Sequence, residues 1–146
     1  MTSAIGSLEA AMKHAMAVRP KVGGFPVLAE ALRRAGCRKN IWDLPSCQAV
    51  YVMQQGNVVM LPLPPLIKPG EKIIVPTFDG AGVVRAIRAD QQGQTTFPEF
   101  VQGVWAAGVV RYVVDFNART VTYFGLLPGE AYEEAYPEVN VPALGM

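Results

Sequence analysis

Apolar and polar residues alternate near the end of the chain in the pattern of a β-hairpin. Between residues 110 and 116 every second side chain is Val, Tyr or Phe, a polar turn follows at Asn117, and residues 120–124 return with the same period of two. Such an alternation is typical of strands with one buried face. We therefore predict a hairpin over residues 110–124.

The first half of the chain has the same organisation. Residues 37–42 lead into a turn at positions 44–46, and residues 48–53 return. A third strand is predicted after each hairpin, at residues 58–63 and 131–136. Strands joined by such short turns favour antiparallel pairing.

A helical spacing of apolar residues precedes each hairpin. In the first half, Ser7 can cap a helix whose apolar residues recur every three or four positions until Pro20. In the second half, Asp79 can cap a helix that carries Val83 to Ile87 and ends near Gly93. We predict one helix at each of these places.

A further helix is predicted in each half, immediately before the hairpin. Pro26 and Pro98 each follow a phenylalanine and suit the first helical position. Gly36 and Gly108 can supply the left-handed residue that ends these helices. The stretch Thr96–Glu99 also has the spacing of a capping box, which would start the second of these helices one residue earlier.

The two halves align with each other at a constant offset of 72 residues. Residues 25–36 and 97–108 share a Phe-Pro start, the phase of their apolar residues and a closing glycine. A slip of one residue after the hairpins then aligns Gly56 with Gly129. Agreement of turn residues with apolar phase predicts an internal duplication.

These patterns together predict an α+β fold. We expect a single domain over residues 1–146, built from two helix-helix-β-hairpin units at about 7–64 and 79–137 and a proline-rich linker at 61–70. The strands should form one antiparallel sheet, or two packed ones, covered by helices on a face. Residues 72–75 are predicted as a short extra strand.

The second unit resembles a known family. Residues 96–100 (TFPEF), 107–112 (AGVVRY) and 115–125 (DFNARTVTYFG) are similar to the YbcV-like family of small bacterial proteins, some of which carry a phage-envelope label. The resemblance covers about residues 80–140, and the first half more loosely. It implies an α+β domain of unknown function and supplies no catalytic residues.

Composition indicates a folded protein without a membrane segment. Hydrophobic residues make up 51% of the chain and charged residues 17%. The longest apolar run, residues 58–67, is interrupted by prolines and is too short to span a bilayer, and no export signal is recognisable. We expect a cytoplasmic protein with reduced cysteines and no membrane partner.

The distribution of charge along the chain bears on whether nucleic acid or another copy of the chain is a partner. A net charge of +1 gives no positive field for nucleic acid, so none is expected as a partner. Residues 1–72 nevertheless carry a net charge of +5 and residues 73–146 one of −4. Unless this split is chance, the two faces could attract each other within one chain or hold a homo-oligomer together.

Three residues are candidates for nucleophilic or metal chemistry. His14, the one histidine, is predicted as a surface or packing residue of its helix. Cys37 and Cys47 lack paired ligand spacing, so neither a metal site nor a cofactor is predicted. Cys37 should be a small buried strand residue. Cys47 lies in a predicted turn, where Arg38 or Lys39 could lower its pKa and make it a nucleophile.

Carboxylates offer a second possibility. Asp43 and Asp115 occupy equivalent positions in the two units, and a two-fold axis could bring them together as an acid-base pair. The alternative is that each accepts hydrogen bonds from its own turn. Asp79 precedes two closely spaced glycines, as phosphate-binding loops do, but the third glycine position holds Arg85, so a plain helix cap is favoured.

Aromatic and basic side chains near the strands could line a pocket between the two units. The candidates are Trp42, Tyr51, Tyr112, Tyr123, Arg38 and Arg111. Because no catalytic constellation is complete, the leading hypothesis is a noncatalytic ligand-binding or protein-interaction domain. The alternative is a small enzyme that uses Cys47 or the Asp43/Asp115 pair.

Overall fold

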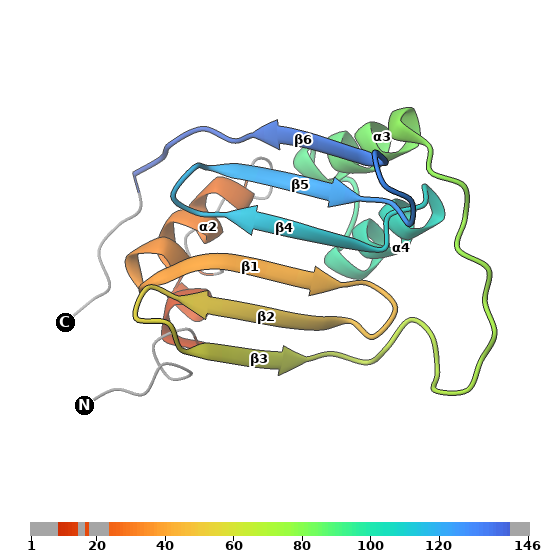
Figure 1. Cartoon of the computed structure of the whole chain (residues 1–146). Coiled ribbons are helices and arrows are strands. Elements are labelled where there is room, and N and C mark those ends of the chain that lie inside the picture. The colour runs from red at the N-terminus through yellow and green to blue at the C-terminus, as the bar shows by residue number, and fades with distance from the viewer. Residues whose placement is uncertain (1–8, 15–16, 18–23, 141–146) are drawn as a thin grey trace.

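A six-stranded antiparallel sheet runs through the protein (Figure 1). The computed structural model describes residues 9–14, 17 and 24–140. The elements with defined bounds are α2 (Phe25–Arg34), β1 (Cys37–Asp43), β2 (Gln48–Met53), β3 (Val58–Pro62), α3 (Gly80–Gln91), α4 (Phe97–Ala106), β4 (Arg111–Asp115), β5 (Thr120–Phe124) and β6 (Ala131–Ala135). The strand order is β3-β2-β1-β4-β5-β6, so the α+β class is confirmed, with one sheet rather than two.

The helices before the two hairpins begin differently. In α4, Thr96 is the N-cap: the Glu99 amide donates to Thr96 Oγ1 at 3.3 Å, and the Thr96 amide donates to Glu99 Oε1 at 2.9 Å. The capping-box alternative is therefore the correct start. In α2 the N-cap is Gly24, which offers no side-chain bond. Gly36 and Gly108 end these helices with φ of 96° and 92°, as predicted.

The pairing of β1 with β4 places the two halves around a common centre. The paired positions include Lys39 with Asp115, Ile41 with Val113, and Asp43 with Arg111. A shift of 72 residues, forward for the first member and backward for the second, turns the pair Lys39–Asp115 into the pair Arg111–Asp43, and leaves Ile41–Val113 as it is. The register therefore has an approximate two-fold axis through Ile41 and Val113. The third strands begin at Val58 and Ala131, 73 positions apart, which matches the one-residue slip.

The core lies between the sheet and the helices. α3 contributes Val83 and Ile87, and α4 contributes Phe100 and Val104. They pack against alternate residues of the strands, whose buried side chains include Ala49, Tyr51, Tyr112, Val114, Val121 and Tyr123. The period of two in the sequence thus marks the side of the sheet that the helices cover.

The connection from β3 to α3 departs from expectation. The strand predicted at residues 72–75 is wrong: this segment has no strand partner, and Ile74 is 92% exposed. Further along, Phe78 passes so close to Gly108 that a Cβ there would lie 2.5 Å from Phe78 Cα. Asp79 is the N-cap of α3 by position, yet its side chain makes no capping bond and instead accepts from Arg85 at 3.3 Å.

The first helix of the chain is described only in part. Residues 9–14 are helical, and Ala11 packs against Ala31 of α2. The predicted cap at Ser7 and the predicted stop at Pro20 lie outside the described residues. No helix in the described part of the chain combines the length and the apolar character needed to cross a bilayer.

Candidate functional site

One face of the sheet has no described helix against it. In Figure 1 α2, α3 and α4 all lie behind the strands, and the viewer looks onto the opposite side, which we call the outer face. Its side chains form three rows that cross the strands from β3 to β6. The rows are Pro62, Gln48, Asp43, Arg111, Phe124 and Ala131; Met60, Val50, Ile41, Val113, Thr122 and Glu133; and Val58, Val52, Lys39, Asp115, Thr120 and Ala135.

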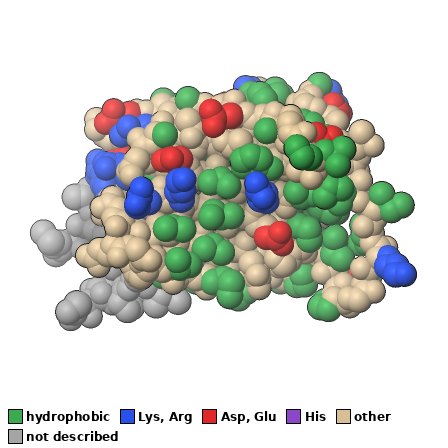
Figure 2. Space-filling view, in the orientation of Figure 1, with side chains coloured by type: hydrophobic (Ala, Val, Ile, Leu, Met, Phe, Trp, Pro, Cys, Tyr) green, Lys and Arg blue, Asp and Glu red, His purple; other side chains and the backbone are tan. Residues whose placement is uncertain are grey.

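Most side chains on the half of the outer face formed by β1, β2 and β3 are apolar, and we call this part the apolar half; Gln48, Asp43 and Lys39 are its polar members. Val58 and Met60 are 58% and 54% exposed, and Val50, Val52 and Ile41 beside them are half-buried. Figure 2 shows hydrophobic side chains gathered across the middle of this face, with a few charged side chains among them. Most antiparallel sheets with one solvated face carry polar residues at such positions. The alternation that buries one face here leaves a second apolar surface.

Charges on the two central strands alternate around this surface. In the first row Asp43 lies opposite Arg111, and in the third row Lys39 lies opposite Asp115. The central row between them is uncharged on these strands, with Ile41 opposite Val113. The sign of the charge is therefore reversed between the two rows: β1 is negative in the first row and positive in the third, and β4 is the opposite.

The predicted ligand residues are divided between the two faces. Tyr51, Tyr112 and Tyr123 are 3%, 5% and 6% exposed and lie under the helices. Burial raises the pKa of Tyr51 to about 12 and holds those of Tyr112 and Tyr123 even further above the usual value. Their hydroxyls therefore stay protonated at neutral pH. The structure assigns these three tyrosines to the core.

Trp42 begins a row of aromatic rings on the covered side. Its ring lies 6.0 Å from that of Tyr112, which is 5.5 Å from Tyr123, and Tyr123 is 6.4 Å from Tyr132. These residues are directly opposite one another on neighbouring strands, where aromatic pairs stabilise a sheet. The indole Nε1 of Trp42 donates to Asn40 Oδ1 at 2.7 Å. The row explains why aromatics gather on these strands.

The two predicted arginines are separated from this row. Arg38 is exposed beside an irregularity in the pairing of β1. Arg111 lies on the outer face with its guanidinium carbon 4.4 Å from the ring centre of Phe124. A shallow cavity of about 360 Å³ is lined by Arg111 and Phe124 together with residues 125–131. Of the six predicted ligand residues, only Arg111 contributes to this cavity.

Neither cysteine has the environment of a nucleophile. The expectation of an exposed Cys47 thiol with a lowered pKa is wrong: Cys47 is 6% exposed, and burial, with the nearby charge of Asp43, raises its pKa. The segment after β3 lies beside Cys47, and the Leu63 amide donates to the Cys47 carbonyl at 3.1 Å. Cys37 is fully buried, and burial raises its pKa to about 11.

The two equivalent aspartates serve their own turns. Asp43 accepts from the amide and hydroxyl of Ser46, and Asp115 accepts from the amides of Asn117 and Ala118 at 3.1 and 2.9 Å. The register places them at opposite ends of the β1–β4 pair, about 14 Å apart along the strands. The two-fold axis therefore relates these carboxylates without bringing them together.

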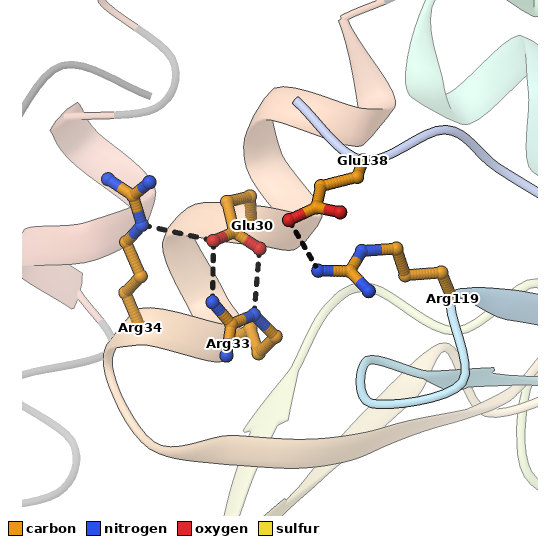
Figure 3. Close-up of polar contacts among 5 residues, drawn as sticks. All are labelled: Glu30, Arg33, Arg34, Arg119 and Glu138. Carbon is orange, nitrogen blue, oxygen red and sulfur yellow. Dashed lines mark hydrogen bonds and ion pairs between the residues drawn. The ribbon is translucent and has the colours of Figure 1, made fainter. Parts of the chain in front are cut away.

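Sequence patterns did not reveal an ionic cluster on α2, in which two partly exposed arginines bind the buried Glu30. Arg33 donates to both oxygens of Glu30, at 2.8 and 2.7 Å, and Arg34 donates to it at 3.0 Å (Figure 3). Arg119 and Glu138, also drawn there, pair at 3.4 Å. The spacing of Glu30 with residues three and four positions later was the available signal. The hydrogen bonds from Arg33 lower the pKa of Glu30, against the effect of its burial.

No three His, Cys, Asp or Glu side chains gather as metal ligands within the ranges described above. His14 lies in the helical stretch 9–14 and is half-buried, in line with a packing position. The outer face is consequently the feature of the described residues that calls for a functional explanation.

Comparison with known proteins identifies bacterial relatives. Residues 13–134 match the model of a family described as a protein of unknown function (DUF1398). Uncharacterized proteins of Mycobacterium bovis and of two strains of Mycobacterium tuberculosis are each 48% identical over 140 residues, 96% of this chain and 83% of the relative. The YbcV-like name of the family resemblance stays a prediction.

Proposed function

We propose that the chain, which belongs to the DUF1398 family of proteins of unknown function, is a protein-interaction domain that docks a partner protein on its outer face. The observation that carries this proposal is the apolar half of that face, on the side of the sheet away from the helices. Contiguous exposed apolar surface is rare on proteins that act alone and marks interaction sites.

The shape and composition of the outer face favour a protein as the occupant. Its apolar side chains spread over three neighbouring strands, and a second sheet or a helix buries such a surface better than a small molecule does. Each 100 Å² of apolar surface removed from water contributes about 2.5 kcal/mol. The charges of Lys39, Asp43, Arg111 and Asp115 then orient the partner.

The cytoplasm is the compartment that this proposal assumes. Cys37 and Cys47 are both free, which suits a reducing environment. An enzymatic role is not part of the proposal, because neither Cys47 nor the two aspartates has an environment that favours catalysis.

An internal duplication is part of the proposal and explains the symmetry of the outer face. Three observations support it: α2 and α4 begin and end 72 positions apart, the β1–β4 register is two-fold, and positive φ recurs at Cys47 and Arg119. If it is correct, profiles of residues 25–62 and 97–135 built separately from family members should match each other better than shuffled profiles do. Profiles that match no better than shuffled ones would contradict it.

Site-specific photo-crosslinking in cells tests the proposed interaction. A photoreactive residue at Val58 or Met60, both exposed on β3, should give a discrete intermolecular product. The same residue at Gln102, exposed on α4 on the opposite side of the sheet, is the matched control and should give none. Equal products at all three positions, or none at any, would overturn the proposal.

A further inference from the structure

We propose that the partner on the outer face is a second copy of this chain, packed face to face about a two-fold axis that runs between the two outer faces, parallel to the sheets and perpendicular to their strands. The inference rests on the proposed function and names the occupant of the same surface. It follows from the charges and apolar residues of the three rows, whose positions are fixed by the strand register.

The charge pattern of the central strands complements itself under this rotation. Turning one copy over about such an axis keeps each strand above its own copy and exchanges the first row with the third. Lys39 then faces Asp43 of the partner subunit, and Arg111 faces Asp115 of the partner subunit. Four opposite-charge contacts result in a dimer, and no like charges meet on β1 or β4. Among the described residues neither Lys39 nor Arg111 makes an ion pair within its own chain.

The positions of the apolar residues favour this axis over a two-fold axis that runs along the strands. A rotation about an axis along the strands would also pair opposite charges, but it would place Met60 of β3 above Glu133 of β6. In the proposed packing the central row lies on the axis, so Met60, Val50 and Ile41 each meet their own copies. Apolar surface is then buried against apolar surface.

Glu133 sets the limit of the interface. It lies at the β6 end of the central row and is exposed, so the two copies of this residue approach each other only at the rim, where water screens their charges. Six strands of five positions make a face of roughly 29 by 17 Å. That is near the lower size limit of specific interfaces, so the dimer should be reversible and dependent on concentration.

Sedimentation equilibrium of the full chain over a range of concentrations tests the inference. The natural chain should show a monomer–dimer equilibrium, and Met60→Glu should weaken it at least about tenfold, because two carboxylates would meet on the axis. Ile74→Glu is the matched control: Ile74 is 92% exposed, against 54% for Met60, and lies in the connection between β3 and α3, outside the three rows. A natural chain that stays monomeric at all concentrations, or equal effects of the two variants, overturns the inference.

Mixing two charge variants tests the geometry. Lys39→Glu and Asp43→Lys should each weaken the dimer alone and form a heterodimer when mixed, because the two new charges face each other in the proposed packing. Asp43→Asn, which keeps an acceptor for Ser46, replaces Asp43→Lys if that variant does not fold, and should restore part of the association. If Lys39→Glu is instead rescued by Asp115→Lys, the strand-parallel axis is correct and the proposed packing is wrong.

The crosslinking experiment separates this inference from the proposed function. A monomeric chain that still forms crosslinks at Val58 and Met60, but not at Gln102, would overturn the second copy and leave an interaction domain with another partner. A monomeric chain without crosslinks at any of them would overturn both.

Discussion

The two edge strands of the sheet occupy equivalent places in the two halves of the chain and carry opposite chemistry on the outer face. β3 presents Val58 and Met60, whereas β6 presents Ala131 and Glu133 at the corresponding positions. Edge strands with apolar residues invite pairing with other chains, and charges on an edge prevent it. The second half therefore has a protected edge and the first half does not.

The covered side of the sheet shows the reverse difference. Tyr132 of β6 continues the aromatic row, and its hydroxyl donates to Glu134 at 2.7 Å, while Arg88 of α3 donates to the same carboxylate at 3.1 and 3.0 Å. At the position in β3 that corresponds to Tyr132 the first half has Val59, which is only partly buried. The two edge strands thus have the same place in the sheet, but β6 directs its large apolar side chain toward the helices, whereas β3 directs its large apolar side chains toward the outer face.

The largest expected effect is a difference in the free energy of unfolding between alanine substitutions at Gly36 and Gly108, which end helices at corresponding positions. Gly36 and Gly108 have nearly the same φ, but a Cβ at Gly108 would lie 2.5 Å from Phe78 Cα, whereas one at Gly36 would meet only Met53 Cε, at 3.8 Å. Gly36→Ala should cost about 1–2 kcal/mol for the left-handed backbone alone. Gly108→Ala should cost about 3 kcal/mol or more, because Phe78 must move as well. Urea unfolding of both variants measures the difference, and equal losses would contradict it.

The sequence predicted the parts of the fold that depend on local chemistry. Glycines with positive φ and the capping box act within a few residues, and the hairpins follow from alternation and turn composition. The prediction that Pro26 and Pro98 open their helices is wrong by one residue, because α2 and α4 each begin at the preceding phenylalanine. The alignment at an offset of 72 left open whether the strands form one sheet or two, and the register between β1 and β4 is known only from the structure.

The remaining features depend on contacts between distant segments. Cys47 was predicted as exposed, yet it is buried where residues 63–67 return over its turn, with the Ile67 amide donating to the Pro45 carbonyl at 3.1 Å. Residues 72–75 are apolar enough for a strand but have no strand beside them to pair with. Alternation also predicts that a strand has two faces without showing that Val50 and Val52 would be the ones left uncovered.

The second prediction concerns a buried carboxylate that α2 contains and α4 does not. Glu30 of α2 is bound by Arg33 and Arg34, whereas Gln102, at the equivalent position of α4, is exposed. Glu30→Gln should cost about 1.5–3 kcal/mol at pH 7, the usual contribution of hydrogen bonds to a charged group. Gln102→Glu is the control and should change the free energy of unfolding by less than about 0.5 kcal/mol.

Acid should reduce the difference in the free energy of unfolding between the natural chain and Glu30→Gln. Because the pKa of Glu30 is lowered on folding, its contribution is complete above its ordinary pKa of 4.5 and is lost as the pH falls through the lower folded value. Urea unfolding of the two proteins at pH 7 and pH 3 measures this, and an unchanged gap at low pH would contradict the assignment.

The third prediction compares the turns between the paired strands. Cys47 and Arg119 both have positive φ, 52° and 57°, but the first is a buried thiol and the second a half-exposed cation. Since burial raises the pKa of Cys47, its alkylation at pH 7 should be at least about tenfold slower than that of a free thiol such as glutathione. Cys37 should react more slowly still. Fast labelling at Cys47 alone, followed by mass spectrometry, would instead support the enzymatic alternative.

The smallest expected effect concerns the start of the two equivalent helices. Thr96→Ala should remove the capping box of α4 and cost about 1 kcal/mol, whereas Thr96→Gly, which gives α4 the N-cap residue that α2 already has in Gly24, should cost only a few tenths. The difference arises because an exposed glycine leaves the free amides of the first turn open to water, while alanine neither bonds nor exposes them. Thermal unfolding of both variants measures it. If Thr96→Gly is as damaging as Thr96→Ala, the capping box sets the geometry of this turn, and α4 then depends on a local signal that α2 does without.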